Sequence, residues 1–170
     1  MERDDKPLTA GRRSLGLWII LIGASVSIVA ASGNPEEYVV FAAVAGAVCA
    51  MLLFYMVREF RKKVPALLAT GQALERYDYT AQARKGTQII LGVLAFLVLP
   101  LALSGFLDAP SWFGSVIGGI DGWLVSLVAY DAVLKRWQQT HGGKLYQSLV
   151  WRGTKVAQKG LKFQKEAGPS

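Results

Sequence analysis

The stretch GGIDGW, residues 118–123, places a carboxylate, Asp121, inside a long apolar segment. Between Ala109 and Leu134 the only charged residues are Asp121 and Asp131, and residues 14–32, 38–57 and 86–107 carry no charged side chain at all. Each of these four stretches is near the roughly 20 residues that a helix needs to cross a bilayer. The sequence therefore predicts an all-α integral membrane protein with four transmembrane helices, arranged as two tandem hairpins.

The composition agrees with a membrane protein. Hydrophobic residues make up 52% of the 170-residue chain and charged residues 18%, which is too apolar for a typical soluble domain. The first apolar stretch follows two arginines, as in a secretory signal. We expect it to be retained, because it is longer than a usual signal core and the tail before it carries three acidic residues.

The basic residues predict the orientation. All 19 Lys and Arg lie in three segments: four in the N-terminal tail, seven between the second and third expected helices, and eight after the fourth. The turns GNPEE (33–37) and DAPS (108–111) have none. By the positive-inside rule we expect a plasma (inner) membrane protein with both termini in the cytoplasm, while an organelle membrane of equivalent orientation stays open. The expected division of the chain is a cytoplasmic tail (1–13), a first hairpin (14–57), a basic segment (58–87), a second hairpin (88–134) and a basic tail (135–170).

The two longer basic segments carry apolar residues at about helical spacing, such as Leu145, Leu149, Val156 and Phe163 in the tail. This pattern predicts amphipathic helices on the membrane surface or against a partner, with frayed, solvated helices as the alternative. Anionic lipid head groups explain the basic charge, so we expect no nucleic-acid partner. The side chains expected to contact lipid or a partner are Arg61, Lys62, Lys63, Lys144, Arg152, Lys155, Lys159 and Lys162.

Asp121 is the candidate functional residue. It lies near the middle of its helix, about 14 Å from the first residue. An ionised carboxylate at that depth is costly unless it is paired, hydrated or protonated. Three roles are open: a hydrogen bond to another helix, contact with another subunit, or a proton or cation step. The candidate hydrogen-bond partners are Ser25, Ser27 and Ser104, and Ser126 and Tyr130 would extend a polar path.

Small residues recur every four positions in the expected helices. Such rows let helix backbones approach closely in lipid, so the pattern predicts tight helix packing. The row on the fourth helix is Gly114, Gly118 and Gly122, and similar rows include Gly23 on the first helix and Gly46 on the second. Asp131 precedes Lys135 by four residues, which predicts an ion pair at the membrane interface.

The motifs for common chemistry are absent from the sequence. His141 is the only histidine, and there is no GxxxxGK[ST], GxSxG or HExxH motif. We therefore expect no metal site, no cofactor and no enzymatic activity.

These features favour a non-catalytic accessory, structural or assembly subunit of a larger membrane complex. Such a subunit would dock through the small-residue rows and the basic segments, with other membrane subunits or copies of itself as partners. One alternative is a small oligomeric transporter or channel that uses Asp121. A second is a membrane anchor whose basic tail recruits a soluble partner.

Overall fold

The computed structural model describes residues 2–8, 12–84, 86–88, 91–92 and 109–165. The chain divides into two compact units. We call Met1–Gly11, Met56–Gln82 and Tyr130–Ser170 the sheet unit, and Arg12–Tyr55 and Ala83–Ala129 the helix unit. The labelled elements, in chain order, are β1 (Glu2–Pro7), α1 (Arg12–Ser32), α2 (Pro35–Thr70), β2 (Gln72–Arg76), α4 (Ala109–His141), β3 (Gly143–Arg152) and β4 (Lys155–Lys165). Residues 79–84 are helical as well.

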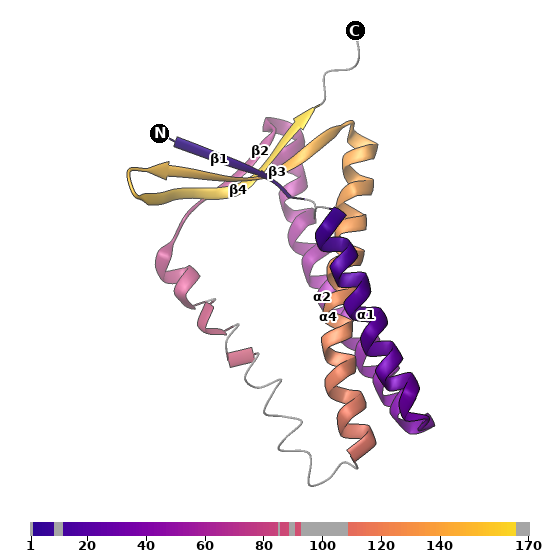
Figure 1. Cartoon of the computed structure of the whole chain (residues 1–170). Coiled ribbons are helices and arrows are strands. Elements are labelled where there is room, and N and C mark those ends of the chain that lie inside the picture. Colours follow the sequence, from indigo (N-terminus) through magenta and orange to yellow (C-terminus); the bar gives the residue numbers. More distant parts are fainter. Residues whose placement is uncertain (1, 9–11, 85, 89–90, 93–108, 166–170) are drawn as a thin grey trace. The chain divides into compact units, whose positions relative to one another are not determined.

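The sheet unit contains a four-stranded antiparallel sheet with the order β1-β3-β4-β2 among the described residues (Figure 1). The β3–β4 hairpin forms its centre, with Leu145 opposite Phe163. Among the described strands, the edge strand β1 pairs only with β3, and the other edge strand, β2, pairs only with β4. Strands from three distant parts of the chain therefore meet in one sheet.

Three glycines with positive φ, Gly71, Gly142 and Gly153, connect the described elements of the sheet unit. Gly71, at φ 70°, ends α2, and its N–H donates to the Leu67 carbonyl oxygen at 3.0 Å. Gly153, at φ 63°, is the first residue of the two-residue turn between β3 and β4, whereas Thr154 has no positive φ. This combination is typical of a type II′ turn, whose backbone twist matches that of a hairpin.

One face of the sheet packs on the parts of α2 and α4 that belong to the same unit. The buried cluster consists of Phe60 and Leu67 from α2, Leu134 from α4 and Leu145 from β3. Trp137 closes the cluster, with its ring centroid 5.4 Å from that of Phe60 in an edge-on arrangement. Burying these side chains stabilises the unit by roughly 1.5–3 kcal/mol for each aliphatic or aromatic residue.

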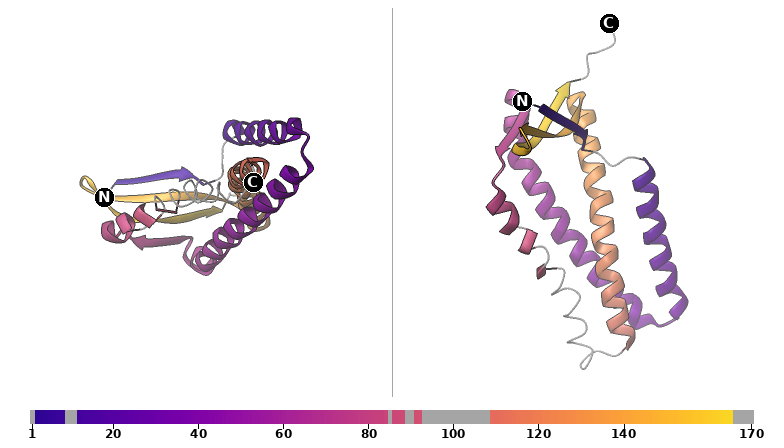
Figure 2. Two further views of the ribbon diagram at one scale, coloured as in Figure 1. Left: turned by 90° about the horizontal axis from the view of Figure 1, so that it is seen from below. Right: turned by 60° about the vertical axis from the view of Figure 1, so that its left-hand side comes forward.

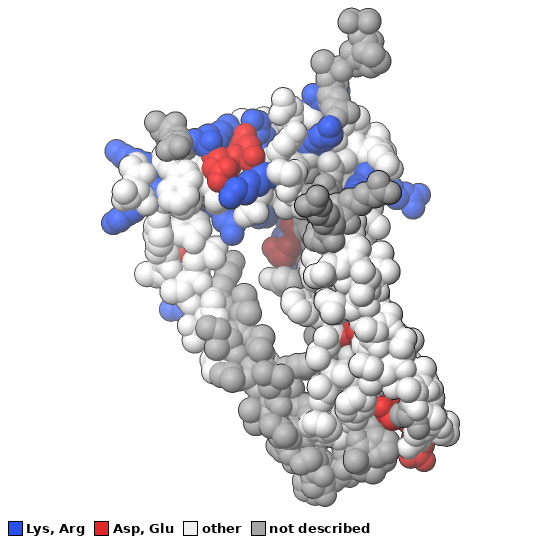
Figure 3. All heavy atoms as spheres, in the orientation of Figure 1, with Lys and Arg blue, Asp and Glu red and all other residues white. Residues whose placement is uncertain are grey.

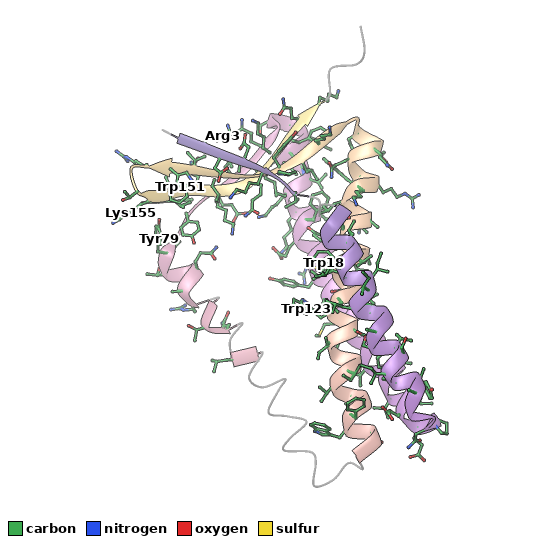
Figure 4. All side chains as sticks on the ribbon, viewed as in Figure 1. Arg3, Trp18, Tyr79, Trp123, Trp151 and Lys155 are labelled. Atoms are coloured by element: carbon green, nitrogen blue, oxygen red, sulfur yellow. The ribbon has the colours of Figure 1, made fainter. Side chains whose placement is uncertain are left out.

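Farther along the sheet, Tyr79 lies beside the β3–β4 hairpin that carries Lys155 (Figure 4). The Tyr79 hydroxyl accepts a hydrogen bond from the Val156 N–H at 2.7 Å. This hydrogen bond connects the segment after β2 with strand β4.

In the helix unit, α4 lies between α1 and α2 in both views of Figure 2. The outward side chains of these helices are apolar; Ile20 of α1 and Phe54 of α2 are each 70% exposed. Surfaces of this kind are usual against lipid or a partner, and rare in water.

The prediction of an all-α fold is wrong, because the described residues contain the four-stranded sheet. The error lies in the prediction that residues 58–87 and 135–170 form amphipathic helices. In the first segment α2 continues to Thr70 and is followed by β2, and in the second α4 continues to His141 and is followed by β3 and β4. Pairing with β1 and β2 supplies the strands with backbone hydrogen bonds that local periodicity does not reveal.

The prediction of a multi-pass four-helix bundle is also wrong. By length and composition, two of the described helices are long and apolar enough to cross a membrane: Pro35–Thr70 and Ser111–His141. The apolar part of α1, Leu15–Ala31, is shorter. The helix expected within residues 88–107 falls largely outside the described residues, as does Ser104.

Candidate functional site

The glycine row of α4 packs against the backbone of α2. A Cβ atom placed on Gly118 would lie 2.6 Å from the Phe41 carbonyl oxygen, closer than real Cβ atoms come. Gly114 and Gly122, one turn before and after, would place a Cβ 2.7 and 2.5 Å from other α2 carbonyl oxygens. Only glycine permits this approach, so the two helices meet backbone to backbone.

The small-residue rows of α1 and α2 are open in the described part of the chain. Nothing there lies within 4 Å of a Cβ placed on Gly23 or Gly46. The face that α2 turns to α4 is a different one, formed by Glu37, Phe41 and Ala45. The other exposed members of the open rows are Ser27 and Ala31 on α1 and Ala42 and Ala50 on α2.

Asp121 lies where α4 meets α1 and is 2% exposed. The Ser25 hydroxyl of α1 donates to Asp121 Oδ1 at 2.6 Å. Asp121 Oδ2 is buried and has no hydrogen-bond partner among the described residues. Residues 14–57 contain no Lys, Arg or His, so neither the apolar stretch of α1 nor that of α2 offers Asp121 a cation. Ser25 and Ser27 were both candidate partners of Asp121. Ser25 makes this hydrogen bond, and Ser27 instead donates to the Gly23 carbonyl oxygen of its own helix.

The other two members of the expected polar path have different surroundings. Ser126 is fully buried, and its hydroxyl donates to the Trp123 carbonyl oxygen of its own helix at 2.7 Å. Tyr130 belongs to the sheet unit, where it packs against the cluster of Phe60 and Leu134. The structure therefore does not assemble Asp121, Ser126 and Tyr130 into one site of the helix unit.

Glu37 is a buried carboxylate that the sequence analysis placed in the turn GNPEE (33–37). It is 3% exposed, and its Oε1 atom has no hydrogen-bond partner among the described residues. It lies in the first turn of α2, where its carbonyl oxygen and Cγ flank Gly114 of α4. The available signal was the spacing of Glu37, Phe41 and Ala45, which places all three on one helix face.

Asp131 and Lys135 form an ion pair within the sheet unit. Lys135 Nζ lies 2.6 Å from Asp131 Oδ2, one helical turn away on α4. Asp131 is 6% exposed, whereas the Lys135 side chain is partly exposed. The pair therefore keeps a nearly buried carboxylate next to its counter-charge.

The eight basic residues expected to contact lipid or a partner all belong to the sheet unit, and Figure 3 shows Lys and Arg gathered over it. Two of them have acidic partners across the unit: Lys162 lies 2.7 Å from Asp5, and Lys63 lies 3.2 Å from Glu75. Lys62 pairs with Glu59 on the same helix. Arg61, Lys144, Arg152 and Lys155 are exposed, and Lys159 is partly exposed.

A polar network joins all four strands on one face of the sheet. Arg3 of β1 donates to Ser148 of β3 at 2.9 Å and to Gln72 of β2 at 3.2 Å. Lys162 of β4 donates to Asp5 of β1 at 2.7 Å. Burial opposes ionisation of Asp5, but hydrogen bonds from Lys162 and Ser148 and the charges of Arg3 and Lys162 outweigh it and hold the pKa of Asp5 below its usual value.

The described residues contain no group of three or more His, Cys, Asp or Glu side chains that could hold a metal ion. The two buried carboxylates of the helix unit, Asp121 and Glu37, are thus the groups there that call for a chemical explanation. No protein-family model, curated protein or solved structure matches the chain.

Proposed function

We propose that this chain is a non-catalytic accessory or structural subunit of a larger membrane protein complex, with partner helices docked on α1 and α2. The observation that carries the proposal is the open row on α2, where Ala42, Gly46 and Ala50 are all exposed. Rows of this kind bring helices together in lipid because small residues let the backbones approach. The row on α4 is filled by α2 in the same manner, so the chain already uses this contact once.

The apolar surface of the helix unit supports a place in the membrane. Val39 of α2 is 69% exposed, close to the values for Ile20 and Phe54, and Trp123 of α4 is 53% exposed. Leaving apolar surface in water costs roughly 25 cal/mol per Å². Lipid tails and partner helices together would cover it.

The pairing of the strands supports the placement of all the basic segments on one side of the membrane. The four strands come from residues 2–7, 72–76 and 143–165 and are hydrogen-bonded to one another, so they lie on the same side of any membrane. The three longer segments that contain these strands, residues 1–13, 58–87 and 135–170, hold all 19 Lys and Arg. By the positive-inside rule this side is the cytoplasm, either of the plasma (inner) membrane or of an organelle membrane of equivalent orientation. The exposed basic side chains of the sheet unit would then meet anionic head groups.

The test is a pair of substitutions on α2 in the tagged full-length protein. Gly46→Leu fills the open row, and Ala47→Leu adds similar bulk at the next, also exposed, position. After extraction in mild detergent, native mass spectrometry should find other chains bound to the wild type and to Ala47→Leu in fixed ratio. Gly46→Leu should lose them while it still elutes as a folded protein. A wild-type chain that leaves the membrane alone, or only with copies of itself, would refute the proposal.

A second candidate function is a membrane anchor that recruits a soluble partner. The observation in its favour is that the basic tail is a folded part of the sheet unit, with Arg152 and Lys155 exposed at the hairpin turn. Removing the tail cannot test this function, because β3 and β4 hold β1 and β2 in the sheet. The suitable variant is the double change Arg152→Glu and Lys155→Glu, which should abolish recruitment but leave the sheet intact.

A further inference from the structure

We infer that Asp121 is a proton-exchanging carboxyl group, so that the helix unit takes up and releases a proton from within its packed interior. This inference goes beyond the accessory function and does not depend on it. It rests on a carboxyl side chain that is almost fully buried and has one oxygen, Oδ2, that lacks a hydrogen-bond partner among the described residues.

The described surroundings of Asp121 contain no counter-charge for its ionised form. The part of α1 that packs on α4 contributes the neutral Ser25, and residues 15–31 contain no charged or titratable side chain. Between residues 38 and 55, α2 has only Tyr38, Cys49 and Tyr55 as titratable groups, none of them cationic. An ionised carboxylate at such a position costs several kcal/mol, and taking up a proton removes that cost.

The hydroxyl of Ser25 suits a carboxyl group that changes its protonation state. Ser25 Oγ lies 3.0 Å from the Leu21 and Ile22 carbonyl oxygens as well as 2.6 Å from Asp121 Oδ1, yet a hydroxyl has only one hydrogen to donate. When Asp121 is ionised, Ser25 donates to it. When Asp121 carries a proton on Oδ1, it donates to Ser25 Oγ, and Ser25 donates to a carbonyl oxygen of its own helix. The contact therefore persists in both states, and only the direction of the hydrogen bond reverses.

The exchange step is simple proton binding. A hydronium ion gives its proton to a carboxylate oxygen, an O–H bond forms, and neutral carboxylic acid and water result; release is the reverse. No oxidant, reductant or further reactant is needed.

Infrared difference spectroscopy of the full-length protein in lipid vesicles tests the inference. At neutral pH we expect a carboxylic-acid C=O band that shifts when water is replaced by D₂O, because the proton exchanges with solution. Asp121→Asn, which keeps size and most hydrogen bonding, should weaken the band. Glu36→Gln is the control, since Glu36 is an exposed carboxylate of the same unit, and it should leave the band unchanged.

Three results would overturn the inference. A wild-type spectrum without a carboxylic-acid band would mean that Asp121 is ionised. A band that does not shift in D₂O would mean a structural proton that does not exchange with solution. A band that disappears when Na⁺ is added at constant pH would assign Asp121 to a metal cation instead of a proton.

Discussion

Replacing Gly118 by alanine tests the backbone contact between α4 and α2. The added Cβ would lie 2.6 Å from the Phe41 carbonyl oxygen, whereas ordinary contacts begin at 3.4 Å. The helices must therefore separate by about 0.8 Å at this point, or the new atom stays strained. Overpacking of this size typically costs about 1–3 kcal/mol.

Gly46→Ala is the control for this substitution. It makes the same chemical change in a helix interior, but nothing in the described chain lies within 4 Å of the new Cβ. Alanine favours a helix over glycine by about 1 kcal/mol, and this gain applies to both variants. The difference between the two variants therefore isolates the cost of the contact.

The measurement is the free energy of unfolding of each variant, from SDS titrations in mixed micelles followed by tryptophan fluorescence. Gly118→Ala should be less stable than Gly46→Ala by about 1–3 kcal/mol. Equal free energies of unfolding would show that α4 and α2 do not meet backbone to backbone.

Three further predictions concern the sheet unit. Leu67→Ala removes a side chain that is 1% exposed and should lower the free energy of unfolding by about 2–5 kcal/mol in the same titration; a loss below 1 kcal/mol would contradict the buried cluster. Gly160→Ala would place a Cβ 2.0 Å from the Ala73 carbonyl oxygen, so β2 amides should exchange faster with deuterium, and unchanged protection would refute the register. Because the pKa of Asp5 is lowered in the folded state, its stabilising effect is complete above its unfolded pKa of about 4 and is lost as the pH falls through the folded value. Asp5→Asn should therefore be less stable than wild type at pH 7 but equally stable once Asp5 is protonated in the wild type, and a difference that persists in acid would contradict this.

The apolar helices were predictable from the sequence, whereas the sheet was not. The stretches over residues 38–57 and 109–134 lie within α2 and α4, the two described helices of membrane-spanning length and composition. The strands were missed because a spacing of four residues, as between Leu145 and Leu149, places two side chains on one face of a strand as well as of a helix. The signal that separates the two cases is Gly153-Thr154, a hairpin turn flanked by strand-like residues.

A residue of the candidate site was predictable where its side chain differs in chemistry from its neighbours in the sequence. Asp121 stands out because it is a carboxylate in an apolar run, and Ser25 could be proposed as its partner. Glu37 does not stand out, since it follows a proline turn and another glutamate. Its burial results from its contact with Gly114, almost 80 positions later in the chain, and a single sequence does not reveal such a pairing.

The order of the strands in the sheet also constrains how the protein is made. Glu2 pairs with Trp151, so β1 leaves the ribosome 149 residues before the part of β3 with which it pairs. At translation rates of about 5–20 residues per second, this interval is about 7–30 s. During it β1 and β2 have no strand to pair with, because both of their partners belong to the C-terminal hairpin. Assembly of the sheet is therefore a post-insertion event, and nascent chains that stall before Gly143 would expose both edge strands to chaperones and proteases.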